Sequence, residues 1–208
     1  MALDTACAID WVRRTAATIE EHRAELVTLD REIGDGDHGE NLGRGFRAVL
    51  EAVDGGSFET PGAVLKVVAT KLISTVGGAA GPLYGTAYLK AAQAAGDATD
   101  LDAQTLVAVL VAARDGVVSR GKAEVGDKTM VDAWTPAVDA AQAAADAGEG
   151  PERVLAAAAD AAAEGAASTE PLVARKGRAS YLGDRAIGHR DPGAQSSAYL
   201  LRAAADAA

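Results

Sequence analysis

Apolar residues recur every three or four positions along most of this chain, which is the pattern of helices that bury one face. Near the N-terminus, for example, Ile9, Val12, Ala16 and Ile19 fall on one stripe. The expected helices cover residues 4–22, a shorter segment leading into Asp30, 40–53, 61–76, 82–95, 103–119, 129–147, 151–168 and 193–205. Convincing strand patterns are absent, and the connections are short. The pattern therefore predicts a single all-α domain over residues 1–208, an antiparallel barrel or bundle of about eight helices.

Capping residues mark several of the expected helix boundaries. Thr60 precedes Pro61, which is the favoured order of an N-cap followed by proline at the first helical position. Asp102 is placed to cap the helix that follows it, and Gly96 ends the helix before it. Pro136 lies inside an expected helix, where it predicts a kink or an early break.

Composition narrows the class of protein. Hydrophobic residues make up 49% of the 208 residues but aromatic residues only 4%, so small side chains must form the core of closely spaced helices. The net charge of −10 argues against nucleic acid as a partner. The longest apolar run, 106–113, is far shorter than the ~20 residues that span a bilayer. The single cysteine, Cys7, excludes an internal disulfide, and the N-terminal residues lack a signal-peptide pattern, so we expect a cytoplasmic protein.

The connections between helices are richer in chemistry than the helices themselves. Four of them are unusually rich in Gly, Asp, Arg and His, namely residues 30–39, 76–85, 120–129 and 175–193. They alternate along the chain, one after every second helix or so. In an up-and-down bundle such loops emerge at the same end, which is where we expect the active site.

The first of these connections concentrates carboxylates. Asp30, Asp35 and Asp37 lie among glycines, which let the backbone turn sharply enough to bring them together. Massed carboxylates repel one another unless a cation neutralises them, and oxygen-only ligands favour Mg²⁺, Mn²⁺ or Ca²⁺ over zinc. A plain solvated Asp-Gly turn is the alternative. An EF-hand is excluded, because no glutamate stands at the twelfth position of either possible loop.

The second and third connections suggest anion binding. Residues 76–85 combine glycines with an immediate helix start, so they either cradle a phosphate or allow tight helix packing. Residues 116–123 match G-x-x-x-x-G-K, but they follow a helix and carry Ala123 in place of the P-loop hydroxyl, so they are not a P-loop. Taken separately, Lys122 and Lys128 are expected to be surface lysines. Thr129 is expected to cap the next helix.

The last connection is the most cationic part of an acidic chain. An arginine in residues 174–180 suits a phosphate group, because guanidinium binds phosphate through two parallel hydrogen bonds. Asp191, before Pro192 and Gly193, belongs to the site or is only a turn and helix N-cap. No G-x-S-x-G elbow or Cys–His pair supports acyl-transfer chemistry.

Taken together, these four connections resemble one family. The runs LDREIGDGDHGENLGRGF, VGGAAGPLYGT, SRGKAEVGDKTMVDAW and ARKGRASYLGDRAIGHRDPGAQSS are similar to the DhaL-type nucleotide-binding subunits of dihydroxyacetone kinase. The resemblance implies an antiparallel helical barrel in which Asp30, Asp35 and Asp37 hold a pair of Mg²⁺ ions that bridge the phosphates of ADP or ATP. It also implies nucleotide contacts at His38, Gly39, Asn41, Ala79, Ala80, Gly121, Thr129, Met130, Arg178, Asp191, Pro192 and Gly193.

One position departs from the family pattern. Ala80 stands where members commonly carry serine, which removes a hydroxyl near the expected phosphates. A neutral hydrogen bond contributes ~0.5–1.5 kcal/mol, so we expect weaker binding rather than none.

The resemblance also implies an activity and its partners. The chain would pass a phosphoryl group to dihydroxyacetone held on a separate DhaK-type subunit, and a DhaM-type phosphohistidine protein would rephosphorylate ADP in place. Arg178 is expected to stabilise charge in transit, and we assign no general base. The alternatives are an ATP-dependent triose or tetrose (erythrulose-type) kinase subunit and a regulatory module that docks on a transcription factor. A purely structural metal-binding protein is disfavoured by the four enriched connections.

Overall fold

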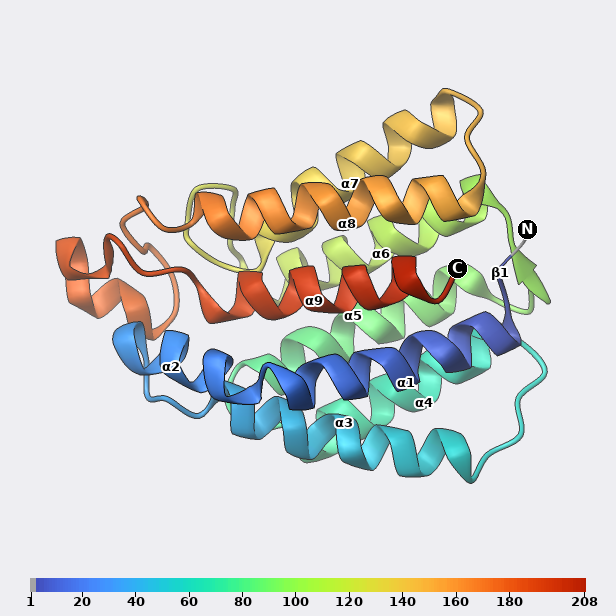
Figure 1. Ribbon diagram of the computed structural model, residues 1–208, viewed down its shortest axis with the longest axis horizontal. Coiled ribbons are helices and arrows are strands. Elements are labelled where there is room, and N and C mark those ends of the chain that lie inside the picture. The colour runs from blue at the N-terminus through green and yellow to red at the C-terminus, as the bar shows by residue number, and fades with distance from the viewer. Residues whose placement is uncertain (1–2) are drawn as a thin grey trace.

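The computed structural model describes residues 3–208, in which nine α-helices, one 3-10 helix and a small two-stranded sheet form the fold (Figure 1). The expected all-α domain is confirmed. In chain order the elements are β1 (Leu3–Asp4), α1 (Thr5–Glu21), α2 (Arg23–Ile33), α3 (His38–Asp54), α4 (Pro61–Thr75), α5 (Ala80–Ala95), β2 (Asp100–Leu101), α6 (Ala103–Gly121), α7 (Val131–Asp146), α8 (Pro151–Ser168), η1 (Arg178–Ala186) and α9 (Pro192–Asp206).

Eight of the helices form a closed ring. α1, α3, α4, α5, α6, α7, α8 and α9 each pack against the next, and α9 packs against α1 to close the ring. α2 follows α1 after a break at His22 and extends toward η1 at the end of the ring opposite β1 (Figure 1). The sequence count of about eight thus matches the ring, with α2 as an extension of it.

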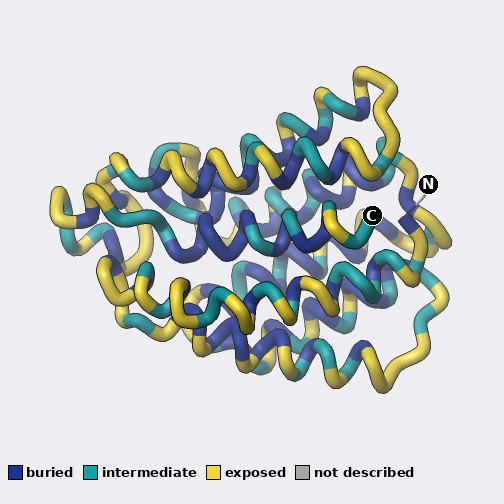
Figure 2. Tube along the Cα trace, viewed as in Figure 1, coloured by how far each residue is buried: buried dark blue, intermediate teal, exposed yellow. Residues whose placement is uncertain are grey.

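The helices turn their buried faces toward one another, as Figure 2 shows, and small side chains make up part of this core. On α8, Ala158, Ala162 and Ala166 have no exposed surface. A Cβ atom added at Gly165 of α8 would lie 2.3 Å from the backbone oxygen of Asp132 on α7, so these two helices can approach only because residue 165 is glycine. None of the helices in residues 3–208 is both long and apolar enough to cross a membrane.

The caps expected at Thr60 and Asp102 are in place. The side chains of Thr60 and Asp102 accept hydrogen bonds from the backbone N–H groups of Ala63 and Thr105. α7 continues through Pro136 to Asp146. Of the two expectations for this proline, the early break is therefore wrong.

A 3-10 helix occupies part of the last connection, where the sequence predicted only a loop. Ala179 and Ala186 of η1 pack with Ile33 of α2 and with Ala174 in a small apolar cluster outside the main core. This cluster fixes the cationic segment against α2, beside the aspartate loop.

Candidate functional site

The end of the ring that carries α2 and η1 contains a cavity of about 330 Å³. All four enriched connections contribute to its walls, as their alternation along the chain predicted. Among the residues singled out in the sequence, the cavity is lined by Asp30, Asp35, Asp37, His38, Asn41, Ala79, Ala80, Gly121, Thr129, Met130, Arg178, Asp191, Pro192 and Gly193. Gly39 does not line it: a Cβ atom there would lie 2.2 Å from the backbone oxygen of Arg23, so this glycine lets α3 pack against α2.

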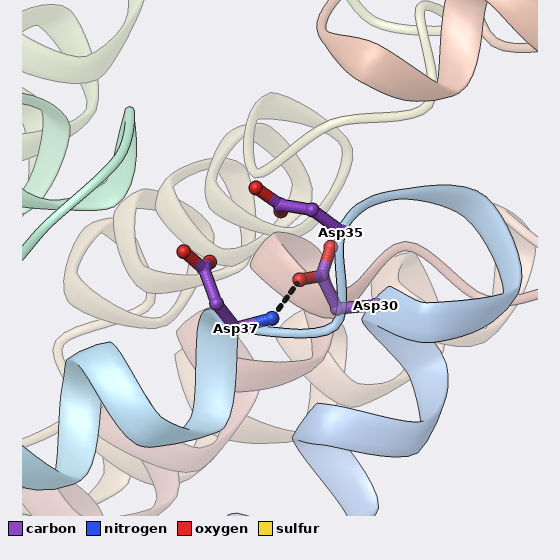
Figure 3. Close-up of side chains that lie close together, drawn as sticks. All are labelled: Asp30, Asp35 and Asp37. Atoms are coloured by element: carbon purple, nitrogen blue, oxygen red, sulfur yellow. Dashed lines mark hydrogen bonds between the residues drawn. The ribbon is translucent and has the colours of Figure 1, made fainter.

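The three aspartates meet at one side of the cavity. An oxygen of each of Asp30, Asp35 and Asp37 lies within 4.8 Å of the other two (Figure 3). Asp30, on the last turn of α2, is buried, and its Oδ2 accepts hydrogen bonds from the backbone N–H groups of Asp37 (2.8 Å) and His38 (3.1 Å). Asp30 therefore fixes the start of α3, and the exposed Asp35 and Asp37 are presented beside it.

Gly34 is required for this arrangement. A Cβ atom at this position would lie 2.1 Å from Oδ1 of Asp30, which is closer than any real contact. Gly36, at the turn, has a φ of +75°, a conformation that glycine adopts without steric cost. The glycines of this connection thus serve the placement of the carboxylates.

The carboxylate cluster has one cationic partner in the described chain. Nη2 of Arg178, on η1, lies 2.9 Å from Oδ2 of Asp35, and the arginine side chain is 68% exposed. An ion pair this exposed contributes at most about 1 kcal/mol, so the cluster keeps much of its negative charge. Three carboxylates offering only oxygen atoms fit a hard divalent cation such as Mg²⁺.

Several helices point their positive ends at the same cavity. His38, Ala80, Val131 and Pro192 are the first residues of α3, α5, α7 and α9, and all of them line it. Each helix N-terminus carries roughly half a positive charge, which attracts an anion. Some of the N–H donors are already taken by side chains, at His38 by Asp30, at Val131 by Thr129 and at Ala194 by Asp191. The site therefore combines an acidic corner for a cation with dipoles that favour a polyanion.

A buried chain of hydroxyl groups joins three of these helices. Nε2 of His38 lies 2.8 Å from Oγ of Ser196, which lies 2.6 Å from the hydroxyl of Tyr84. That hydroxyl also lies 3.0 Å from Oγ of Ser197 and donates to the backbone oxygen of Gly193. Burial lowers the pKa of His38 to about 4, against the opposing effect of the nearby aspartates, so its imidazole is neutral near pH 7.

Asp191 caps α9, and it also lines the cavity. Its Oδ2 accepts a hydrogen bond from the N–H of Ala194 (2.7 Å), and its own N–H donates to Oγ1 of Thr169 (3.0 Å). Burial raises the pKa of Asp191 to about 7, and the nearby carboxylates of Asp132 and Asp30 act in the same direction. The hydrogen bond from the Ala194 N–H and the charge of Lys128 act in the opposite direction. Asp191 is therefore the N-cap of α9, as one interpretation had it, and it also lies at the cavity wall, as the other interpretation requires.

The start of α7 differs from expectation. Met130, not Thr129, occupies the N-cap position, although the Thr129 hydroxyl accepts a hydrogen bond from the N–H of Val131. The buried carboxylate of Asp132 accepts from the N–H groups of Thr129 (2.7 Å) and Gly126, and so shapes the preceding turn.

The two lysines of this connection have different environments. Lys122 is exposed, as expected for a surface lysine. Lys128 is only 1% exposed, so the expectation was wrong for it. Its ammonium group donates to the backbone oxygens of Thr169, Glu170 and His189.

The DAK2 domain family matches residues 32–206 of this sequence. The chain belongs to the DAK2 domain family. It is 42% identical over 208 residues to a protein of Escherichia coli (strain K12) named PEP-dependent dihydroxyacetone kinase, ADP-binding subunit DhaL. The alignment covers 100% of this chain and 99% of that protein. It is 37% identical over 185 residues to L-erythrulose 1-kinase of Mycolicibacterium smegmatis, covering 88% of this chain and 32% of that protein.

A solved structure has the same fold. The dihydroxyacetone kinase of C. freundii in complex with AMP-PNP and Mg²⁺ matches with a TM-score of 0.72 and 25% identity, over 100% of this chain and 35% of that chain. The resemblance noted in the sequence is thus confirmed, as is the expectation of a kinase or phosphotransferase subunit.

Sequence reasoning missed several residues that shape the site of this DAK2 domain. Polar residues interrupt otherwise apolar helix faces at Tyr84, Ser196 and Ser197. This interruption was the one feature of the sequence that could have indicated a buried polar contact. Asp132 and Lys128 gave weaker signals, because a charged residue beside a turn is ordinarily solvated.

Proposed function

We propose that this DAK2-domain protein binds ADP or ATP with Mg²⁺ in the cavity and passes a phosphoryl group to dihydroxyacetone held on a separate DhaK-type subunit. A DhaM-type phosphohistidine protein would rephosphorylate the bound ADP. The observation that carries this proposal is the meeting of three carboxylates with the N-termini of α3, α5, α7 and α9 around one cavity. The name of a full-length relative, a PEP-dependent dihydroxyacetone kinase subunit, supports dihydroxyacetone as the acceptor and PEP as the source of the phosphoryl group. The DhaK-type and DhaM-type partners are proposed from the family resemblance.

The acidic corner supplies the ligands for the metal. Asp30, Asp35 and Asp37 would hold Mg²⁺, as a pair of ions in our proposal, through carboxylate oxygens alone. Bound Mg²⁺ supplies charge neutralisation for the phosphates. Asp30 holds its carboxylate by two backbone hydrogen bonds, so one ligand is positioned before any ion arrives.

The helix N-termini would hold the phosphates. Ala79 and Ala80 stand at the start of α5, and Gly193 follows Pro192 at the start of α9. The N–H groups of Ala79, Ala80 and Gly193 have no partner within their own helix, whereas Pro192 has no N–H and only shapes the turn. Arg178 would stabilise the charge of the group in transfer, since its exposed guanidinium already lies beside Asp35.

The remaining wall suits a nucleotide base. Leu83, Val117, Ala123 and Met130 line the part of the cavity formed by α5, α6 and the connection after α6, and Gly121 adds a position without a side chain. A flat aromatic ring would be buried there against apolar surface.

We assign no general base within this chain. The His38 imidazole is neutral, but its Nε2 is hydrogen-bonded to Ser196, inside the buried hydroxyl chain. Its role is to hold the start of α3 against α9. The proposed transfer therefore depends on charge neutralisation and alignment by this chain.

A titration of the purified protein with ADP, with and without Mg²⁺, tests the proposed binding. We expect Mg²⁺-dependent binding that Asp35→Asn/Asp37→Asn removes, while Asp97→Asn, an exposed aspartate in the α5–α6 connection, leaves it unchanged. Wild-type affinity in the double variant would refute the metal assignment.

The donor needs a second experiment, because similarity to an L-erythrulose 1-kinase favours an ATP-using triose or tetrose kinase as the alternative. The protein loaded with labelled ADP is mixed with DhaK-type and DhaM-type partners, dihydroxyacetone and the phosphohistidine donor system. Under the proposal, turnover proceeds while the label stays bound. Turnover that requires free ATP and releases the label supports the alternative. Repression or activation of a transcription factor without turnover supports a regulatory module.

A further inference from the structure

Lys128 is the most deeply buried cation of the cavity walls, and its surroundings are unusual for a lysine. It lines the cavity, yet only 1% of its surface is exposed. Its ammonium nitrogen lies 2.6 Å from the backbone oxygen of Thr169, 2.5 Å from that of His189 and 3.3 Å from that of Glu170. Three carbonyl groups match the three N–H donors of an ammonium group.

These carbonyl groups belong to two separate segments of the chain. Thr169 and Glu170 follow the last turn of α8, where the negative end of the helix dipole favours a cation. His189 belongs to the turn before α9. The same two segments are joined by the N–H of Gly188, which donates to the backbone oxygen of Glu170 (2.8 Å), and by the bond from Asp191 to Thr169. Lys128 thus joins the connection before α7 to the segment that carries Asp191.

The backbone conformation at Lys128 is unusual for a residue other than glycine. Its φ is +63°, in the left-handed region, where a residue other than glycine costs roughly 1–2 kcal/mol. Lys122 has a similar φ of +52°, but its side chain is exposed. The two lysines therefore share a backbone conformation and differ in what the ammonium group contacts.

We infer that Lys128 is a positioning residue, which sets the distance between two walls of the nucleotide cavity without touching the nucleotide. One wall is Thr129 and Met130, directly after the lysine, and the other is the segment from Asp191 to Gly193. The inference rests on the proposed nucleotide binding. Because its three donors are taken by carbonyl groups, the ammonium group has none left for a phosphate. Burial lowers the pKa of Lys128, and the carboxylates of Asp191, Glu170 and Asp132 oppose that shift.

The test compares Lys128→Met with Lys122→Met, its exposed counterpart. Binding of ADP with Mg²⁺, and of adenosine alone, is measured at a temperature where circular dichroism shows each protein folded. Lys128→Met should weaken both ligands by a similar factor, about 10- to 100-fold, as expected when a residue that orients binding groups is lost. Lys122→Met should leave both dissociation constants unchanged. A residue that only stabilised the fold would lower the melting temperature and leave the affinity of the folded protein unaltered.

Two results would overturn the inference. Loss of ADP affinity with adenosine affinity retained would make Lys128 a direct phosphate ligand. Wild-type affinity for both ligands in folded Lys128→Met would remove any role in binding. Failure of the wild-type protein to bind ADP is a separate outcome, which would refute the proposed function itself.

A measurement on the wild-type protein covers the case in which Lys128→Met does not fold. In protein labelled with ¹⁵N-lysine, a buried ammonium group held by three carbonyls should give a slowly exchanging Nζ signal. That signal should persist when ADP and Mg²⁺ are added, without coupling to phosphorus. Its disappearance, or a coupling to ³¹P, would show that the ammonium group leaves the carbonyls for the phosphates.

Discussion

Replacing Asp37 with asparagine should stabilise the metal-free protein and at the same time remove its stabilisation by Mg²⁺. The substitution keeps the size of the side chain and removes one negative charge from the acidic corner. Within the described chain Asp37 makes no side-chain capping bond to α3, so no hydrogen bond to the helix start is lost. The opposite signs of the two effects make the experiment informative.

The expected gain follows from the spacing of the carboxylates. Their oxygens lie within 4.8 Å of one another, so each pair of charges repels by about 1 kcal/mol in water and by about 3.5 kcal/mol at an effective dielectric constant near 20. Asp37 has two such neighbours. The positive end of the α3 dipole stabilises the charged form of Asp37 by ~0.3–1 kcal/mol, which reduces the gain from removing the charge. Arg178 reduces it further, because it offsets part of the charge of Asp35. The net gain should be about 1 kcal/mol or more.

Urea unfolding, followed by circular dichroism in EDTA and in Mg²⁺, measures both effects. Wild-type protein should gain about 2.7 kcal/mol when Mg²⁺ is present at 100 times its dissociation constant, and Asp37→Asn should gain far less. Asp97→Asn is the control, because it removes the same charge at an exposed site away from the cavity. A variant that is less stable than wild type in EDTA, and keeps the full gain in Mg²⁺, would show that these carboxylates are not a cation site.

Three further substitutions test other parts of the site. Gly34→Ala should displace the carboxylate of Asp30 and abolish the stabilisation by Mg²⁺. Gly150→Ala is the control, because its Cβ atom would have nothing within 4 Å among residues 3–208. Unchanged stabilisation by Mg²⁺ in Gly34→Ala would contradict the steric argument. Asp191→Asn keeps the capping oxygen of α9 but cannot titrate. Because burial raises the pKa of Asp191 from 3.8 to about 7, its protonated form stabilises the metal-free protein at low pH, and that stabilisation is lost as the pH rises through 7. The unfolding free energy of wild type relative to this variant should therefore fall by roughly 1 kcal/mol per pH unit between these values, and a flat difference would place Asp191 in a solvated environment. Ala80→Ser should tighten ADP binding in calorimetry by up to about tenfold, the value of one hydrogen bond, and no change would place residue 80 away from the phosphates.

The elements of the ring could be predicted because their signals are local. Helical periodicity, the Thr60–Pro61 start and the cap at Asp102 each depend on a few neighbouring residues, and the structure has helices at these places. The meeting of the four enriched connections at one end of the ring could also be predicted, because short links force consecutive helices to alternate in direction. The 3-10 helix at Arg178–Ala186 was missed, because so short and irregular an element carries no apolar period.

The internal support of the site could not be predicted, because it depends on residues far apart in the sequence. Lys128 and Thr169 are 41 positions apart, and Tyr84 and Ser196 are 112 positions apart. Nothing in a single sequence says which buried hydroxyl will meet which, or that a lysine beside a turn will face inward. Gly39 shows the converse, since a glycine inside a recognised motif serves helix packing and does not line the cavity.

The distribution of charge explains how a protein with a net charge of −10 can offer a site to a polyanion. Net charge acts at long range and is screened over about 8–10 Å at physiological ionic strength. Inside the cavity the nearest charges decide, and the positive ones include the N-termini of α3, α5, α7 and α9 together with Lys176 and Arg178. The aspartates oppose an anion until a cation joins them, so metal and nucleotide should each raise the affinity of the other. An acidic corner that repels the bare polyanion is thus what ties nucleotide binding to the metal.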